Sequence, residues 1–153
     1  MIDNPTTGIS GSGPRRARRV RPAMLALLGA VVLAACAGPT RMGDARAQTL
    51  LMMPTPQFAA ERQVAFELAQ RCPSYGWDSK LDRDMDEART ARGAGYATAQ
   101  RQRGAIEVET DIKRRSVSAN HGGAPFASLD PCAVLDTESE RQTPLSVLVV
   151  RES

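Results

Sequence analysis

The amino-terminal segment restricts the fold before any other feature, because it indicates that the first 35 residues are removed. Five arginines, from Arg15 to Arg21, precede an apolar run from Ala23 to Ala35. Positive charge followed by a short apolar run and small residues is the layout of a secretory signal. The run is shorter than the roughly 20 residues that a membrane-spanning helix needs. We therefore predict a cleaved signal peptide over residues 1–35, which leaves 118 residues for one small domain.

The residues at the end of the apolar run indicate how the mature chain is held. "LAAC", Leu33 to Cys36, resembles the lipobox of bacterial lipoproteins. The resemblance implies that the chain is cut before Cys36 and that this residue carries a diacylglycerol and an amide-linked fatty acid such as palmitate. By resemblance to lipoprotein sorting in Gram-negative bacteria, Ala37 after the cysteine implies the periplasmic face of the outer membrane, whereas aspartate there would imply retention in the inner membrane. The alternatives to a lipoprotein signal are an ordinary cleaved signal peptide in which the cysteine occurs by chance, and an apolar segment that stays uncleaved and anchors the chain.

Removal of the signal peptide changes the charge of the protein. Residues 1–35 hold five arginines and Asp3, so they contribute +4 to the formal charge of +3, and the mature chain is close to −1. The basic isoelectric point therefore belongs to the signal peptide and does not indicate nucleic-acid binding. We expect the partners to be the membrane, through Cys36, and an envelope protein.

Two other cysteines, Cys72 and Cys132, remain in the mature chain. In an oxidising compartment an even pair predicts one disulfide, and lipidation of Cys36 leaves a single pairing. Closing a loop of about 60 residues stabilises a fold by roughly 4 kcal/mol in the chain-entropy treatment. The alternative, a metal or redox pair, is less favoured because redox cysteines stand two residues apart and the chain has one histidine. We predict neither a metal nor a cofactor.

The mature chain divides into two parts by composition. Residues 36–56 are rich in glycine and proline and predict a lipidated cysteine followed by a flexible tether. The apolar residues Leu50 to Met53 interrupt this part, and we expect them to pack on the domain, with the membrane surface as the alternative. Residues 57–153 predict a small helical domain.

Helical periodicity and capping signals predict an all-α bundle of about four helices stapled by one disulfide. The expected helices are 55–72, 78–92, 105–118 and one that begins at Asp130 and Pro131. In the third, "IEVETDI" also alternates as a strand would, but Ala105, Val108 and Ile112 fit one helical face. Residues 145–150 fit a short helix or a strand, and the sequence leaves both open.

Four short motifs give the domain a family resemblance. They are "CPS" at Cys72, "GAGY" at Gly93, Cys132 with Glu138 six residues later, and "LVVR" at the carboxyl end. Over residues 57–151 the chain resembles a family of small exported alphaproteobacterial proteins known only as a domain of unknown function. The resemblance implies an all-helical domain with one disulfide. It implies no activity and no functional residues.

Two segments contain residues of the kinds that carry chemistry, but each has a structural interpretation. His121 is the only histidine and follows Asn120 in "NHGG", where a solvent-exposed loop is expected. Lipase oxyanion loops contain His-Gly-Gly but accompany a G-x-S-x-G nucleophile turn, which is absent from the sequence. Lys113 to Arg115 form a basic cluster of the kind that is common near the end of a helix.

Asp82, Asp84 and Asp86 match the first, third and fifth positions of a calcium-binding EF-hand loop. The sixth and twelfth positions should be glycine and glutamate, but they are Glu87 and Gly93. The pattern fails at both diagnostic positions. The sequence therefore predicts no metal ligand and no catalytic residue.

These observations favour a non-enzymatic envelope lipoprotein that presents a helical binding domain to a protein partner. The alternatives are a small cofactor-free hydrolase acting on cell-wall material and a chaperone-like stress protein. A pocket containing a carboxyl group of raised pKa would favour the enzyme, and an exposed apolar patch would favour the binding domain.

Overall fold

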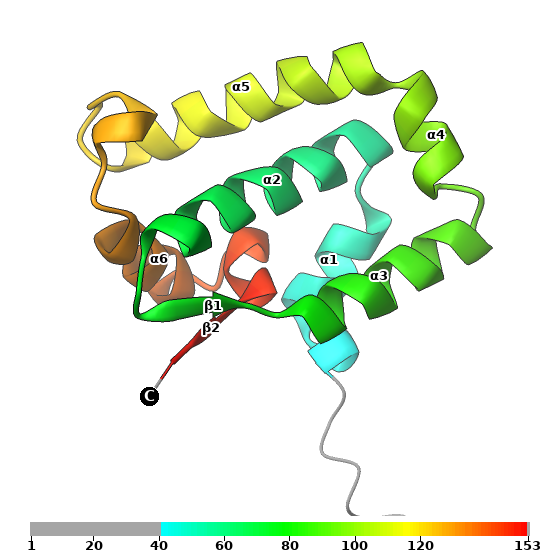
Figure 1. The fold of residues 1–153 in the computed structure, drawn as a ribbon, viewed down its shortest axis with the longest axis horizontal. Helices are drawn as coiled ribbons and strands as arrows, with labels where there is room; N and C mark the ends of the chain where they lie inside the picture. Colours follow the sequence, from blue (N-terminus) through cyan, green and yellow to red (C-terminus); the bar gives the residue numbers. More distant parts are fainter. Residues whose placement is uncertain (1–40, 153) are drawn as a thin grey trace, which may run out of the picture. The chain divides into compact units, whose positions relative to one another are not determined.

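The structure is a computed structural model that describes residues 41–152, so the predicted signal peptide and Cys36 lie outside the described residues. The described part holds six α-helices, three 3₁₀-helices and two short strands (Figure 1). In chain order they are η1 (Arg41–Gly43), α1 (Ala45–Met52), α2 (Thr55–Arg71), β1 (Tyr75–Trp77), α3 (Ser79–Ala91), α4 (Tyr96–Arg101), α5 (Arg103–Asn120), η2 (Phe126–Ser128), α6 (Pro131–Glu140), η3 (Pro144–Leu148) and β2 (Val149–Arg151).

Helix α2 is the centre of the domain, with α5 packed along one side and α1, α6, η3 and β1 on others (Figure 1). The core is mainly aliphatic, as expected for a chain with few aromatic residues. Its largest fully buried side chains are Leu50, Leu68, Met85, Leu135, Leu145, Leu148, Val64, Val117, Val134, Val147 and Cys72. Within the described residues, no helix is long and apolar enough to cross a membrane.

The predicted helix starts at residues 78 and 130 are confirmed by their capping hydrogen bonds. The Asp78 carboxylate accepts from the backbone N–H of Leu81 at the start of α3. The Asp130 carboxylate accepts from the N–H groups of Cys132 and Ala133 at the start of α6. An aspartate at this position satisfies amide donors that have no partner inside the helix.

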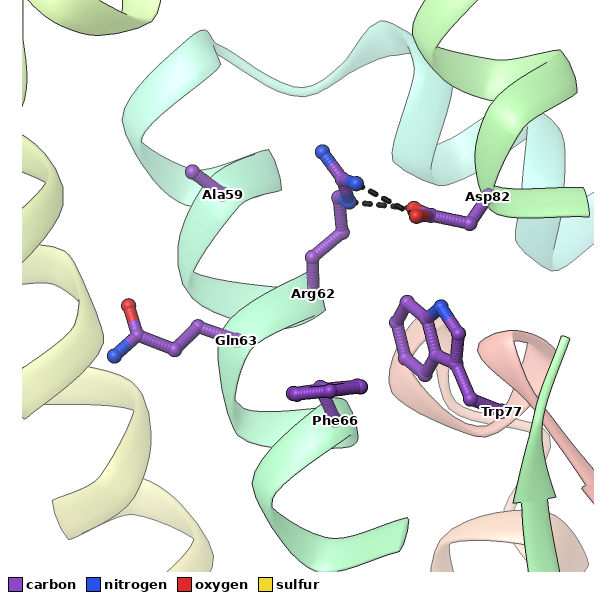
Figure 2. A pocket seen from close by; sticks show the side chains of 6 residues that line it. All are labelled: Ala59, Arg62, Gln63, Phe66, Trp77 and Asp82. Atoms are coloured by element: carbon purple, nitrogen blue, oxygen red, sulfur yellow. Dashed lines mark hydrogen bonds and ion pairs between the residues drawn. The ribbon is translucent and has the colours of Figure 1, made fainter. Parts of the chain in front are cut away.

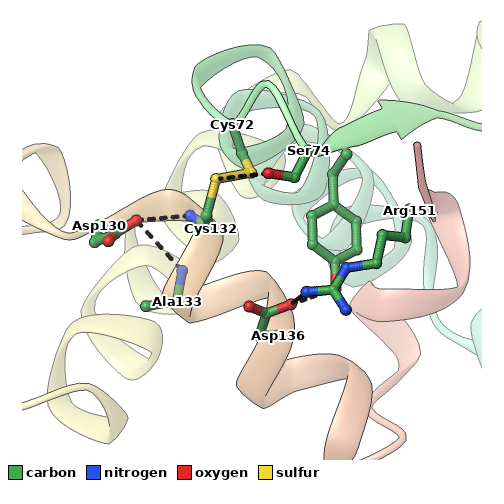
Figure 3. The surroundings of a disulfide bond; sticks show 8 residues. Cys72, Ser74, Asp130, Cys132, Ala133, Asp136 and Arg151 are labelled. Carbon is green, nitrogen blue, oxygen red and sulfur yellow. Dashed lines mark hydrogen bonds and ion pairs between the residues drawn. A yellow bond between two sulfur atoms is a disulfide. The ribbon is translucent and has the colours of Figure 1, made fainter. Parts of the chain in front are cut away.

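The disulfide between Cys72 and Cys132 is present, with the two Cα atoms 5.1 Å apart (Figure 3). Cys72 follows the last residue of α2 and is buried, and Cys132 lies in the first turn of α6. Close to the bridge, Asp136 of α6 accepts a hydrogen bond from the Tyr75 hydroxyl at 2.8 Å and pairs with Arg151 at 2.7 Å. The bridge therefore joins α2 to α6 where both helices meet the small sheet.

The predicted tether over residues 36–56 is wrong from Arg41 onward. Residues 45–52 form α1, whose amino terminus is capped by the Asp44 carboxylate accepting from the Arg46 N–H. Leu50 and Leu51 are buried in the core and Met53 packs against it, which confirms the expected packing for these residues, but Met52 is 76% exposed and does not follow it. The helix is only eight residues long and lies between glycine and proline residues. Its apolar face is therefore too short to be recognised from the sequence pattern.

The helix count is also corrected, from about four to six. Besides α1, the structure adds α4, a six-residue helix between the second and third expected helices. None of its residues is buried, so it has no apolar periodicity that a sequence pattern could detect. The helices expected over 55–72, 78–92 and 105–118 are present with shifts of a few residues at their ends.

Helix α5 confirms the helical interpretation of residues 105–118 and excludes the strand. The face expected to be buried is nevertheless exposed: Val108 is 59% and Ile112 48% accessible. Thr110 and Val117 face the core instead. The reason is that α5 packs on a polar side of α2, where ion pairs rather than apolar contacts make much of the interface.

Two ion pairs hold α5 on α2. The Lys113 ammonium lies 2.8 Å from the Glu61 carboxylate, and Arg114 lies 2.5 Å from Glu67. The predicted basic cluster at 113–115 therefore serves mainly to fasten these two helices. Partial burial raises the pKa of Glu67, but hydrogen bonds from Arg114 and Gln63 outweigh it, and the pKa lies below its ordinary value.

The lowered pKa of Glu67 predicts an acid-sensitive contribution to stability. A carboxyl group with a lower pKa in the folded state stabilises the fold above its unfolded pKa, about 4.3, and loses this effect as the pH falls through the folded value. We expect Glu67→Gln to flatten the fall in the free energy of unfolding below that pH, measured by urea denaturation. Glu140→Gln, at an exposed position, should keep the native dependence; equal slopes for both variants would contradict the prediction.

The carboxyl end contains both alternatives that the sequence left open. Residues 144–148 form the 3₁₀-helix η3, and Val149–Arg151 form strand β2. The strand pairs antiparallel with β1, so that Trp77 lies opposite Val149. A three-residue partner containing a glycine carries too weak a pattern to be recognised in the sequence.

Candidate binding cleft

A shallow cleft of about 380 Å³ lies between the middle of α2, strand β1 and the first turns of α3 (Figure 2). Residues of α2 form one wall, Trp77 at the end of β1 forms another, and Asp82 of α3 lies at the rim (Figure 2). The lining residues are Ala59, Arg62, Gln63, Phe66, Trp77 and Asp82. Three successive elements of the chain thus bring aromatic and charged groups to one place.

The aromatic part of the cleft is a contact between Phe66 and Trp77. Their ring centroids are 5.3 Å apart and the planes are nearly perpendicular, at 83°, the edge-to-face geometry that aromatic rings prefer. Phe66 is nevertheless 41% exposed and Trp77 is half-buried. Pairing of β1 with β2 fixes the backbone of Trp77 opposite Val149. The cleft therefore presents two partly exposed aromatic rings, and strand pairing fixes the backbone of Trp77.

The charged part of the cleft is the Arg62 guanidinium. Its Nε lies 2.6 Å from Asp82 Oδ1, its Nη2 donates to Asp82 Oδ2 at 2.7 Å, and its Nη1 lies 3.6 Å from Asp86. The guanidinium carbon also lies 5.5 Å from the centre of the Phe58 ring. A two-point contact of this kind fixes the orientation of an arginine fork.

The aspartates that partly matched an EF-hand are on α3, where each contacts a cation. Asp82 and Asp86 contact Arg62, and Asp84 accepts from Lys80 one turn away at 2.7 Å. Within residues 41–152, no group of three or more histidine, cysteine, aspartate or glutamate side chains is arranged to hold a metal ion.

The expectation that His121 lies in an exposed loop is wrong. His121 caps the end of α5, its side chain is only 11% exposed, and its Nε2 lies 3.2 Å from Glu138 Oε1. Glu138 is buried on α6. The pair connects the two helices and is made by elements that contribute no residue to the cleft. Sequence reasoning missed the burial because the glycines that follow His121 suggested a loop.

Of the predicted site residues, Cys72 and Cys132 are bonded to each other and do not line the cleft. Cys36 lies outside the described residues. The sequence analysis did not predict the cleft, because no motif there includes Phe66 or Trp77. One signal was present: Phe66 falls outside the buried face of α2 that contains Phe58, Ala65 and Leu68.

The chemistry of the cleft is suited to contact with a protein. Tryptophan and arginine are the residue types that most often contribute large binding energies at protein interfaces. Phe66 adds exposed apolar area, and Gln63 adds an amide that both donates and accepts hydrogen bonds.

In comparisons with known proteins, no family model, curated protein or solved structure matches this chain.

Proposed function

We propose that this chain is a non-enzymatic lipoprotein of the bacterial envelope that binds a protein partner through the cleft of Phe66, Trp77 and Arg62. Acylation at Cys36 holds it on the periplasmic face of the outer membrane. The Cys72–Cys132 disulfide supports a location outside the cytosol, because structural disulfides persist in oxidising compartments.

The observation that carries the binding proposal is the partial exposure of Phe66 beside Trp77. Burying exposed aromatic area in a partner contributes about 25 cal/mol per Å². The Phe66–Trp77 contact and the ion pairs of Arg62 restrict these side chains before the partner arrives. Side chains that are already ordered lose less entropy on binding, which favours affinity.

The alternative, a hydrolase acting on cell-wall material, finds less support in the cleft. General acid–base catalysis by two carboxylates requires at least one of them to be free to give or take a proton. Asp82, the acidic residue among the lining side chains, is bound by Arg62 through two contacts. The cleft geometry therefore supports binding more than catalysis.

The binding proposal predicts a crosslink that depends on Trp77. A photoreactive amino acid placed at Gln63 in the full-length protein should give a discrete crosslinked product with an envelope protein in intact cells. Trp77→Ala should lower the yield at least tenfold, because truncating an interface hot spot costs about 2 kcal/mol or more. Tyr96→Ala removes an exposed aromatic residue of α4 and should leave the yield unchanged.

Two controls keep this result interpretable. Phe66→Ala removes a partly exposed ring and should lower the yield while the circular dichroism spectrum stays native. The same photoreactive group at Gln100, on α4, should not give the product. An equal product from Gln100, or a yield unaffected by both Trp77→Ala and Phe66→Ala in folded protein, would contradict the proposed cleft.

The anchor proposal predicts that Cys36→Ser moves the protein from the membrane fraction to the soluble fraction. Loss of the acyl chains removes the apolar surface that holds the protein on the bilayer, at about 0.8 kcal/mol per buried methylene. Cell fractionation measures the shift, and Tyr96→Ala, which keeps Cys36 and changes an exposed side chain, is the control that should stay membrane-bound. Unchanged retention of the Cys36→Ser variant would rule out anchoring through this residue.

A further inference from the structure

The first described residue is fixed to the domain by its own side chain. Arg41 forms an ion pair with Asp78 through Nη1, and its Nη2 donates to the backbone carbonyl of Val147 at 2.8 Å and of Val149 at 3.3 Å. These partners belong to the start of α3, the end of η3 and the start of β2. The point at which the chain enters the domain is therefore a defined place on its surface.

The chain between Cys36 and this point is short. Only the four residues 37–40 lie between Cys36 and Arg41. Whatever conformation they adopt, five steps of the backbone span at most about 18 Å. A tether that reached Pro56 would have spanned roughly 70 Å. The helix α1 and the contacts of Arg41 remove most of that length.

The cleft lies close to the entry point. Trp77 directly precedes Asp78, whose carboxylate binds Arg41, and Asp82 is one turn further along α3. The end of β1 and the start of α3 lie beside η1, whereas α4 lies at the opposite end of α3 (Figure 1). The start of α3 thus contributes both to the cleft and to the point at which the chain enters the domain.

We infer that the cleft operates next to the lipid headgroups and that its partner is a protein segment held at the same membrane surface. This inference rests on the proposed acylation of Cys36. With both partners confined to one bilayer, the short connection raises the effective concentration of the cleft for a segment near the membrane. The short connection also prevents the cleft from reaching a partner located far from the membrane.

The single tryptophan allows a direct test, because Trp77 is the only residue of its kind in the chain. Purified acylated protein is placed in vesicles that carry an energy acceptor on the lipid headgroup, and transfer from Trp77 is measured. We expect efficient transfer that falls several-fold when a Gly/Ser insertion of about 20 residues, which behaves as a flexible coil, separates Thr40 from Arg41. Moving the energy donor to α4, with Trp77→Phe and Tyr96→Trp, should also lower the efficiency of energy transfer.

The same insertion tests whether the partner is located at the membrane surface. For a partner at the membrane, lengthening the connection from five to 25 steps should lower the crosslink yield from Gln63 by about tenfold, since effective concentration falls as the −3/2 power of length. A higher yield would place the partner away from the membrane and overturn the inference. A blue shift of Trp77 emission in vesicles without other proteins would assign the cleft to lipid and also overturn it.

Failure of the inference and failure of the anchor are distinguishable in these experiments. The mass of the purified amino-terminal peptide reports whether Cys36 is acylated. Acylated protein whose energy transfer is unaffected by the insertion would overturn the membrane-adjacent cleft while leaving the lipoprotein proposal intact. A peptide without lipid would overturn both.

Discussion

Replacing Cys72 and Cys132 together by alanine lowers the free energy of unfolding by about 4 kcal/mol in the chain-entropy treatment of a 60-residue separation. This is comparable to the net stability of a small domain, 5–15 kcal/mol for proteins in general, so the variant should be partly unfolded near physiological temperature. Urea denaturation monitored by circular dichroism measures the difference.

The effect has a structural cause as well as an entropic one. The bridge joins the end of α2 to the first turn of α6, two helices that also pack on each other. Chemical reduction should reproduce the loss, whereas Cys36→Ser should leave the free energy of unfolding unchanged because it lies outside the loop. A double alanine variant within about 1 kcal/mol of the native stability would show that the bridge adds less than the loop-closure treatment requires.

Arg89→Ala should lower the free energy of unfolding by about 3–5 kcal/mol, since it removes a large buried side chain together with its hydrogen bonds. Arg89 is only 3% exposed, and burial lowers the pKa of its guanidinium. It donates to the carbonyls of Leu51 and Met53 at 3.1 and 2.9 Å and to the Thr55 hydroxyl at 3.1 Å.

These acceptors explain why the effect is large. They lie at the end of α1 and the start of α2, so Arg89 of α3 satisfies backbone carbonyls that the ending helix leaves without partners. Its guanidinium carbon also lies 4.2 Å from the centre of the Phe58 ring. The variant therefore leaves buried acceptors unpaired as well as a cavity.

Arg92→Ala is the matched control for Arg89→Ala. Arg92 caps the end of the same helix and is exposed, so its removal should change the free energy of unfolding by less than about 0.5 kcal/mol. Arg89→Lys keeps the charge but not the fork of donors and should recover only part of the loss. Equal stabilities for Arg89→Ala and Arg92→Ala would contradict the role assigned to Arg89.

Local signals in the sequence were sufficient for the helices that carry them. Asp78 and Asp130 bind the first amides of their helices, Pro131 stands at the first helical position, and the helix through Cys72 stops before Pro73. Each of these depends on residues adjacent in the chain. The disulfide was predicted from the cysteine count and the expected oxidising compartment, because the predicted lipidation of Cys36 left two of the three cysteines to pair.

The features that the sequence did not predict depend on contacts between distant residues. Helix α1 is recognisable as part of the core only when α3 supplies Arg89 to its carboxyl end. Strand β1 exists because residues 149–151 return to pair with it. The exposed face of α5 follows from ion pairs with α2 rather than from hydrophobic periodicity.

The sequence did not predict the cleft, because the cleft depends on how α2, β1 and α3 pack together. Arg62, Trp77 and Asp82 come from three elements, and no short motif contains them together. For His121 the local sequence was misleading. The segment "NHGG" suggested an exposed side chain, but the ring is largely buried and pairs with Glu138 on another helix. Only the position of Phe66 outside the buried face of α2 pointed to a surface aromatic group.

The central claim is that the mature protein begins at a lipid-bearing Cys36 and folds outside the cytosol with Cys72 bonded to Cys132. Mass spectrometry of native protein, digested without reduction, tests it most directly. We expect an amino-terminal peptide that starts at Cys36 and carries the mass of a diacylglycerol and a fatty acid, together with a disulfide-linked pair of peptides. An unprocessed amino terminus, or a Cys36 peptide without lipid, would contradict the claim.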